Sequence, residues 1–475
     1  MRSAEELARF ITSPDSQVSP KAREHATGLI LDSFAVMVLG SRQSSYQATA
    51  HALRRIGLLE PGAATVYSDR PFAASPFGAA LLNATAMHLS EMGEGVSRAV
   101  VHASNAVVPA ALAIAEGTEI SGEHFVRSVA LAMETTIRFG LMLNRPAHAA
   151  TDRGDEALAY KAGWWTPSTL SGVGAATVTC LLRGLTAQQV VDAWGIALNS
   201  APTTSVAFVL GGASGKGITM GMGCAGGLQA AELTAAGITG GTAIEKWSAL
   251  LSSAPNPRRL SQDLGTVWEL EFPLYKYFAT VGPLHAAIEA ALWLAQEHKP
   301  DPAEIEKIEV FGYTRTVQFL GEAFPHGEEA AKTSLRHVVA VALATGRADA
   351  FISDAFEPEL RKDPMIGGLA AKVIGIVEPE YDAEYPMRSA RSRLVLHLTG
   401  GRTLEHEIDR DRLPRYHSPS RADLNTKFAG IVVGGPDPDP AVQSVIDLVW
   451  QLPQTQKFQE VPMAVRAILE ERDAI

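Results

Sequence analysis

The chain has 475 residues, of which 46% are hydrophobic and 20% charged, and its formal net charge is −11. This length is too great for one simple core, so one large domain and one smaller domain are expected. The acidic balance argues against a nucleic-acid-binding protein, which would present a basic face. An anionic small-molecule ligand stays open, because a few cationic side chains in one pocket decide that locally.

Neither a secretory signal nor a membrane segment is expected. The N-terminal pattern at 1–11 is an amphipathic helix without the apolar core of a signal peptide. No uninterrupted apolar run reaches the roughly 18 residues that a membrane span needs. Cys180 and Cys224 stand in small apolar segments without a metal-type or redox-type partner nearby. We therefore expect a cytoplasmic protein that binds no membrane.

The first 250 residues predict one helix after another. Several helix starts are marked by a capping residue followed by proline or glycine, or by a capping box. The helix after the first of these starts is apolar nearly all round, which predicts burial among other helices. Small residues are dense between 170 and 245 and would let helices approach closely. The predicted starts are Ser19–Pro20, Ser75–Pro76, Ser121–Gly122 and Thr186–Gln189.

The pattern changes after 255–257. Residues 305–313 alternate like a strand, and 393–408 predict a hairpin that turns at Gly400–Gly401. Helical segments are expected at 283–297, before the strand, and at 332–345, between the strand and the hairpin. The expected fold class is mainly α: a large all-helical domain with a smaller α/β (α+β) lid domain. The expected boundaries are 1–259 for the first part of the helical domain, 260–412 for the lid, and 413–475 for C-terminal helices that return to the helical domain.

An acidic loop follows an apolar helix and precedes another. It carries Glu91 and Glu94, and His102 stands just before the next helix. Carboxylates and an imidazole between buried helices could orient a substrate or move protons. They could equally be solvated loop residues.

Two lysines stand in segments that could contact an anion. Lys216 follows a glycine-rich stretch that lacks the spacing of a phosphate-binding loop, so it either presents an ammonium group to an anion or is merely exposed. Lys276 lies among aromatic residues, where it is a surface lysine, a carboxylate clamp, or a base if desolvation lowers its pKa. His285 opens the helix that follows, and His337 on an apolar helix is by default a core histidine.

Metal and nucleotide sites find little support in the sequence. No His-x-x-x-His, Glu-x-x-His or Cys-x-x-Cys pair occurs. No Gly-x-Ser-x-Gly elbow and no Gly-x-Gly-x-x-Gly after a strand occurs either. We expect no metal and no cofactor, which leaves acid–base catalysis by side chains.

Taken together, these segments resemble the MmgE/PrpD superfamily, which includes 2-methylcitrate dehydratase, cis-aconitate decarboxylase and iminodisuccinate epimerase-like proteins. Each motif is weak alone, but their order and spacing over nearly the whole chain are specific. The motifs are His102 to Ala110 after the acidic loop, Ala162–Trp164 before a small-residue helix, Lys216, the Lys276 and His285 pair, the segment from Ser334, and Asp423 to Phe428.

The resemblance implies a helical domain built from both chain ends, a lid from the middle, a site in the cleft between them, and a homodimer. It implies cofactor-free lyase or isomerase chemistry on a small di- or tricarboxylate. His102 matches the family's catalytic histidine, and Lys216 and Lys276 match lysines that line the pocket. Glu91 and Glu94 fall where the family usually has aspartates, with one residue inserted before His102.

Two positions depart from the family pattern. Trp165 stands where a pocket histidine is common, and His337 stands where a tyrosine is common. Substrate binding is therefore assigned to Glu91, Glu94, Trp165 and His285. Because of these two differences, the resemblance does not assign the substrate of any known family member to this chain.

The expected reaction begins with abstraction of a proton α to a carboxylate. His102 would be the general acid or base, and Lys216 and Lys276 would stabilise the enediolate. His337 would be a second proton-transfer group on the opposite wall. Dehydration is favoured, with decarboxylation and epimerisation as alternatives, and a non-catalytic carboxylate-binding homologue is the rival. All of this requires the nitrogens of 102, 216 and 276 to meet in one crevice.

Overall fold

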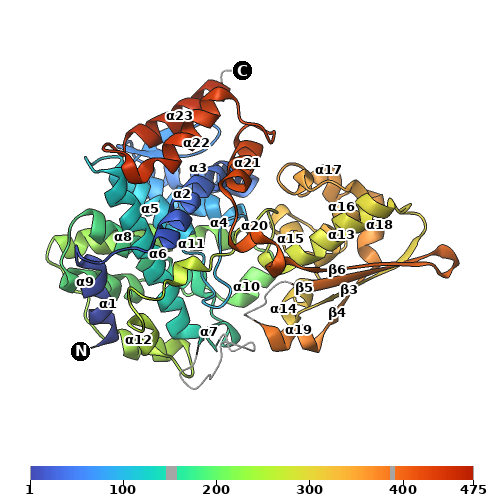
Figure 1. The fold of residues 1–475 in the computed structure, drawn as a ribbon, viewed down its shortest axis with the longest axis horizontal. Helices are drawn as coiled ribbons and strands as arrows, with labels where there is room; N and C mark the ends of the chain where they lie inside the picture. The colour runs from blue at the N-terminus through green and yellow to red at the C-terminus, as the bar shows by residue number, and fades with distance from the viewer. Residues whose placement is uncertain (1, 146–157, 386–390, 474–475) are drawn as a thin grey trace.

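A computed structural model describes residues 2–145, 158–385 and 391–473. A large helical body lies on one side, and a smaller domain with a sheet lies on the other (Figure 1). The mainly α fold class is confirmed. The helical body contains α1 (Ser3–Thr12), α2 (Pro20–Ser41), α3 (Ser44–Arg55), α4 (Pro76–Leu89), α5 (Ser104–Ala115), α6 (Gly122–Asn144), α7 (Leu158–Lys161), α8 (Thr166–Leu182), α9 (Ala187–Asn199), α10 (Val206–Leu210), α11 (Gly215–Ala235) and α12 (Ile244–Leu251), with a hairpin of β1 (Ala64–Val66) and β2 (Phe72–Ala74).

The four helix starts predicted from capping residues are confirmed. The side-chain oxygens of Ser19, Ser75, Ser121 and Thr186 each accept a hydrogen bond from a backbone N–H of the first turn. Thr186 also forms the predicted capping box. Local hydrogen bonding therefore sets where these helices begin.

Glycines let α11 pack tightly between α4 and α8. A Cβ added at Gly221 would stand 2.4 Å from the carbonyl oxygen of Leu81 in α4. One added at Gly227 would stand 2.2 Å from that of Gly172 in α8. Side chains at these positions would force the helices apart, and α11 carries Lys216 at its start.

The smaller domain is built on a four-stranded mixed sheet of order β4-β3-β5-β6. Its strands are β3 (Ile305–Gly312), β4 (Val373–Val377), β5 (Arg391–Leu398) and β6 (Thr403–Asp409). β3 pairs parallel with β4 and antiparallel with β5, and β5 and β6 form the predicted hairpin. The helices here are α13 (His285–His298), α14 (Thr314–Val317), α15 (Glu328–Lys332), α16 (Leu335–Thr345), α17 (Pro358–Arg361), α18 (Pro364–Ala371), α19 (Pro379–Glu384) and α20 (Pro414–His417).

Short 3₁₀ turns connect many of these elements. Gly282–Leu284 leads into α13, and Arg410–Arg412 follows β6. Both turns border the pocket described below. The others are Pro257–Leu260, Glu269–Glu271, Asp349–Phe351, Thr399–Gly401 and Leu452–Gln454.

The C-terminal helices pack against the helical body rather than the sheet (Figure 1). They are α21 (Arg421–Val432), α22 (Pro440–Trp450) and α23 (Glu460–Asp473), and the first two contact α2. Lys427 of α21 forms a buried ion pair with Asp32 of α2, at 2.6 Å. Within the described ranges, no helix combines the length and apolar character needed to cross a membrane.

Candidate functional site

One pocket gathers side chains from both domains. Its volume is about 110 Å³, which suits a small molecule rather than a polymer. Apolar residues such as Val96, Leu274 and Phe319 make up much of its wall. The charged, imidazole and indole groups that line it are Glu91, His102, Trp165, Lys216, Lys276, Arg315 and Arg410, and its tyrosines are Tyr160, Tyr313 and Tyr385.

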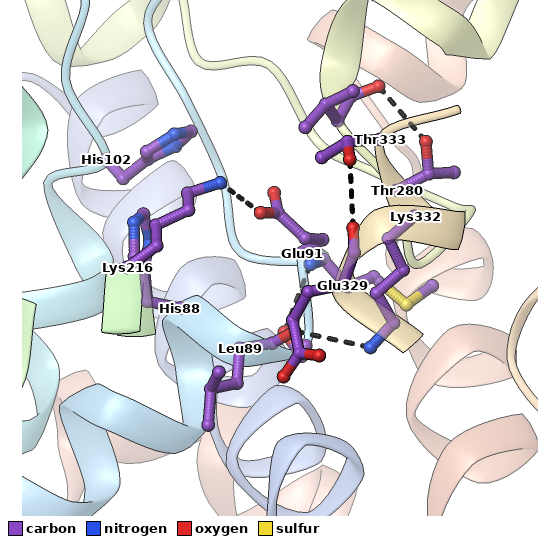
Figure 2. A network of polar contacts seen from close by, with 12 residues as sticks. His88, Leu89, Glu91, His102, Lys216, Thr280, Glu329, Lys332 and Thr333 are labelled. Carbon is purple, nitrogen blue, oxygen red and sulfur yellow. Dashed lines mark hydrogen bonds and ion pairs between the residues drawn. The ribbon is translucent and has the colours of Figure 1, made fainter. Parts of the chain in front are cut away.

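Two lysines hold Glu91 from two directions. Lys216, in the first turn of α11, forms an ion pair with this carboxylate (Figure 2). Lys276 lies 3.6 Å from its other oxygen and donates a 3.0 Å hydrogen bond to the Glu91 carbonyl. Burial alone would raise the pKa of Glu91, but the two ammonium groups outweigh it and hold that pKa below its usual range. Burial, only partly offset by Glu91, lowers the pKa of Lys276 to about 8.

The tautomer of His102 follows from its hydrogen bond. Its Nδ1 lies 2.6 Å from the carbonyl oxygen of Glu94. A carbonyl can only accept, so Nδ1 carries the proton and Nε2 has the lone pair in the neutral ring. Burial, with a contribution from Lys276, lowers the pKa of His102 to about 3. At neutral pH this imidazole is therefore neutral, with its proton on Nδ1, and able to accept a second proton at Nε2.

Glu94 supports the site from behind and does not line the pocket. Its carboxylate accepts hydrogen bonds from the backbone N–H groups of Ala103 and Ser104, each at 3.0 Å. It also accepts one from the Ser104 hydroxyl. These groups open α5, so Glu94 caps that helix while its carbonyl orients His102. Glu94 was predicted to bind substrate, but the structure places it outside the pocket lining, where it positions His102 instead.

A second imidazole lies beside His102. The ring centroids of His88 and His102 are 5.6 Å apart, and the ring of His88 is buried at the end of α4. Its Nδ1 lies 3.4 Å from the Asn105 amide nitrogen, which can only donate, so its Nε2 carries the proton. Burial and the nearby charge of Lys216 lower the pKa of His88 well below its usual value. His88 is thus a neutral ring packed behind the Lys216–Glu91 pair (Figure 2).

Trp165 lines the pocket where the resemblance leads one to expect histidine. Lys216 Nζ lies 5.2 Å from the centre of its ring, a cation–π distance. Its indole Nε1 is buried, and no hydrogen-bond partner for it exists among the described residues. An indole N–H is a donor only, so this side chain cannot accept a proton as an imidazole would.

Two residues of the pocket wall have left-handed backbone. Glu91 has a φ of 56° and Val100 a φ of 52°, a region that favours glycine. Such strain is retained where the surrounding structure holds it, often at functional sites. The position of the Glu91 carboxylate is thus fixed by its own backbone as well as by its ion pairs.

Two predicted histidines do not reach the pocket. His285 is fully buried beside Phe278 and Tyr416, and its Nε2 lies 3.4 Å from the Thr280 carbonyl. His337 is also fully buried in the smaller domain, with its Nε2 2.8 Å from the carbonyl of Ala355. The ring of His337 lies on the apolar face of its helix and packs in the domain core. It is therefore not the second proton-transfer group predicted for the opposite wall of the pocket.

Three site residues escaped the sequence analysis. Arg315 stands two residues after the predicted strand at 305–313, and a cation close to a strand end is a signal that could have drawn attention to it. Arg410 and His88 offered no such signal, because one ends a charged hairpin and the other sits in an apolar helix. Only the meeting of the domains shows that Arg315 and Arg410 line the same cavity as His102.

Fold and site together define a two-domain, mainly helical protein with an acid–base pocket between its domains. The MmgE/PrpD N-terminal domain matches residues 5–249, and the MmgE/PrpD C-terminal domain matches residues 278–452. The chain therefore belongs to the MmgE/PrpD family, as the sequence motifs indicated. This family contains dehydratases and related lyase-type enzymes such as 2-methylcitrate dehydratase. No curated protein matches the chain significantly.

Proposed function

We propose that this protein is a carbon–oxygen lyase that removes a proton α to a carboxylate of a small hydroxylated di- or tricarboxylate. The observation that carries the proposal is the convergence of His102, Lys216 and Lys276 on one pocket. An imidazole with its lone pair at Nε2 stands there beside two ammonium groups. These are the groups that α-proton abstraction requires.

In the proposed step, His102 Nε2 takes the α-proton. The electron pair of the broken C–H bond moves into the carboxylate and forms an enediolate. The ammonium groups of Lys216 and Lys276 stabilise the added negative charge, and the buried setting strengthens that interaction. Glu91 keeps both lysines in place and, as an anion, offsets part of their charge. A bound carboxylate also raises the low pKa of His102, which makes it a better base.

Three outcomes share an intermediate of this type. Departure of a β-hydroxyl, with a proton, as water completes a dehydration. Return of the proton to the other face completes an epimerisation. A decarboxylation reaches a similar enediolate without abstraction of the proton: loss of carbon dioxide leaves the electron pair on a carbon next to a second carboxylate, and protonation of that carbon completes the reaction. Dehydration is our first choice because the family contains dehydratases such as 2-methylcitrate dehydratase.

Proton exchange tests the shared step. Malate, citrate and 2-methylcitrate are incubated with the protein in deuterated water, and mass spectrometry follows α-deuterium and conversion. We expect exchange or conversion of at least one acid, and His102→Ala should slow it by about 10²-fold or more. His337→Asn is the matched control, because that buried imidazole lies outside the pocket. Activity of His102→Ala within a few-fold of the parent would refute the role of His102.

Trp165 supports a second candidate, a carboxylate-binding protein without catalysis. The indole lines the pocket but cannot transfer a proton as histidine would. Thermal stabilisation by these acids, without deuterium exchange or conversion of any of them, would favour binding over the lyase.

A further inference from the structure

A second, smaller cavity lies behind the ion pair of Glu91 and Lys216. Both side chains line this cavity as well as the main pocket, so the pair separates the two spaces. His88 lines the cavity from the helical body, and Glu329 and Thr333 line it from the smaller domain (Figure 2). Its volume of about 10 Å³ is close to the space that one water molecule needs. The proposed reaction gives this cavity no part.

Two side chains of the cavity lining carry a buried polar atom that has no hydrogen-bond partner in the part of the chain that the structure describes. These atoms are Nε2 of His88 and Oε1 of Glu329. Because Nδ1 of His88 accepts from the Asn105 amide, Nε2 is a donor, whereas the oxygen of an ionised carboxylate is an acceptor. One water molecule can accept from the first atom and donate to the second, so neither is left unsatisfied. The cavity therefore has the size and the chemistry of an ordered-water site.

Contacts between the domains hold α15 against this cavity. Lys332, at the end of α15, donates to the carbonyl of Leu89 at 3.3 Å. A Cβ added at Gly212 would stand 2.7 Å from the Cα of Ala330, so a glycine there lets the loop before α11 pack directly on α15. Glu329 is half-buried as a residue although its Oε1 is buried, which places it at the border between solvent and the cavity.

The proposed dehydration needs a proton donor for the departing hydroxyl. His102 holds the α-proton at that stage, and Lys216 presents an ammonium group at the border between the two spaces. If Lys216 gives a proton to the hydroxyl, the C–O bond breaks, water leaves, and the electron pair of the enediolate forms the C=C bond. The lysine loses its positive charge as the enediolate loses its added negative charge, so the total charge in the pocket is unchanged. The neutral amine must then regain a proton while the product still fills the main pocket.

We propose that Glu329 and a water molecule in the second cavity return this proton to Lys216 after each turnover. The Glu329 carboxyl gives a proton to the water, the water gives one to the lysine amine, and Glu329 regains its proton from solvent. Glu329 acts through the water and Lys216 and does not touch the substrate. This inference rests on the proposed function and supplies the proton donor that its dehydration step leaves open.

Glu329→Gln tests the relay, because the amide keeps the size and polarity of the side chain but cannot release a proton in this way. Dehydration of malate, citrate and 2-methylcitrate is followed by the absorbance of the product double bond, and α-deuterium exchange by mass spectrometry. We expect kcat for dehydration to fall about tenfold, less than the roughly 10²-fold or more that loss of a group acting directly on the substrate costs. KM and α-proton exchange should change little, since exchange requires only His102. Glu329→Asp keeps a carboxyl group and should retain more of the turnover.

Glu322→Gln is the matched control. It makes the same change in the smaller domain, at a side chain that is 69% exposed and lines neither cavity. This variant should keep the kcat of the parent. Equal loss of exchange and dehydration in Glu329→Gln would show that Glu329 is only structural, and full dehydration activity in that variant would identify His102 as the proton donor. Either result would overturn the relay.

A high-resolution crystal structure of the parent tests the water without relying on catalysis. We expect one ordered water within hydrogen-bond distance of Nε2 of His88 and Oε1 of Glu329. A direct contact between these two atoms, or a cavity without ordered water, would overturn the relay and leave the lyase standing. An ordered water there, without exchange or conversion of any acid by the parent, would refute the lyase and the proton step and leave only the water site.

Discussion

The two walls of the pocket differ in how their functional groups are held. On the helical side, His102 bonds to the carbonyl of Glu94, and Lys276 bonds to that of Glu91. On the other side, Arg315 is held by the rings of Tyr160 and Tyr385. Hydrogen bonds to backbone are directional and fix a side chain closely, whereas stacking tolerates sliding. His102 and Lys276 thus belong to a rigid wall that suits proton transfer. The wall opposite combines both kinds of contact, because Arg410 there donates a 2.8 Å hydrogen bond to the carbonyl of Gly282.

The loop that carries Glu91 shows how far the rigid wall extends. Lys332 of the smaller domain donates to the carbonyl of Leu89 at 3.3 Å (Figure 2). Gln43 of the helical body donates to the same oxygen. Lys427 from the C-terminal helices lies 3.5 Å from the carbonyl of Met92. Segments from three distant parts of the chain thus meet on one short loop.

The largest expected effect comes from removing the buried ion pair between Lys427 of the C-terminal helices and Asp32 of α2. Lys427→Met leaves Asp32 buried without its ion-pair partner. Removal of one member of a buried pair costs about 3–5 kcal/mol. We expect that loss in the free energy of unfolding by urea titration, together with reduced turnover, because the Glu91 loop loses a support.

An exposed ion pair on the same helix provides the control. Arg421 and Glu24 are both about 59% exposed, and Arg421→Met should cost no more than about 1 kcal/mol. The double variant Asp32→Leu/Lys427→Met should recover most of the loss, since it leaves no buried charge. Equal destabilisation by Lys427→Met and Arg421→Met would contradict a structural role for the buried pair.

A smaller effect is expected from Glu94→Gln, which tests the positioning of His102. The amide replaces one acceptor oxygen by a donor that faces the N–H group of either Ala103 or Ser104, because these two groups bond different oxygens of Glu94, and the cost is about 1–3 kcal/mol. We expect kcat to fall with little change in KM. Loss of the cap would shift the start of α5 and move the adjacent His102 ring away from the position that proton transfer requires.

Glu116→Gln separates positioning from stability. Glu116 likewise accepts a backbone N–H, from Thr65 at 2.8 Å, and a hydroxyl, from Tyr67 at 2.6 Å, but it lies away from the pocket. It should lose similar stability and keep its turnover. If kcat is unchanged in both variants, Glu94 is a helix cap and nothing more.

Much of the fold could be predicted because its signals are local. Ser75 caps α4 through a neighbour three residues away, and Gly400 and Gly401 turn the hairpin with φ values of 81° and 80°. The alternation at 305–313 became β3 because one face of that strand is buried. Such features need only a few adjacent residues.

The site was only partly predictable because it depends on contacts between distant segments. His102, Lys216 and Lys276 could be singled out by the order and spacing of motifs. The cap made by Glu94 depends on how the loop folds back on α5, and the places of Arg315 and Arg410 depend on how the domains meet. His337 shows the reverse case, in which an apolar helix pattern already indicated a core residue and the structure buries it.

The smallest change is the titration of Lys276 itself. The pH dependence of the rate decides whether this lysine acts as a cation or as a base. Burial lowers its pKa to about 8 from an ordinary value above 10. If the lysine stabilises negative charge, it must be protonated, so kcat/KM should fall about tenfold per pH unit above pH 8. Lys276→Gln should be less active at pH 7 and show no such decline up to pH 9.5. A rate that rises through pH 8 in the parent, and not in the variant, would instead identify the neutral amine of Lys276 as the base that takes the proton.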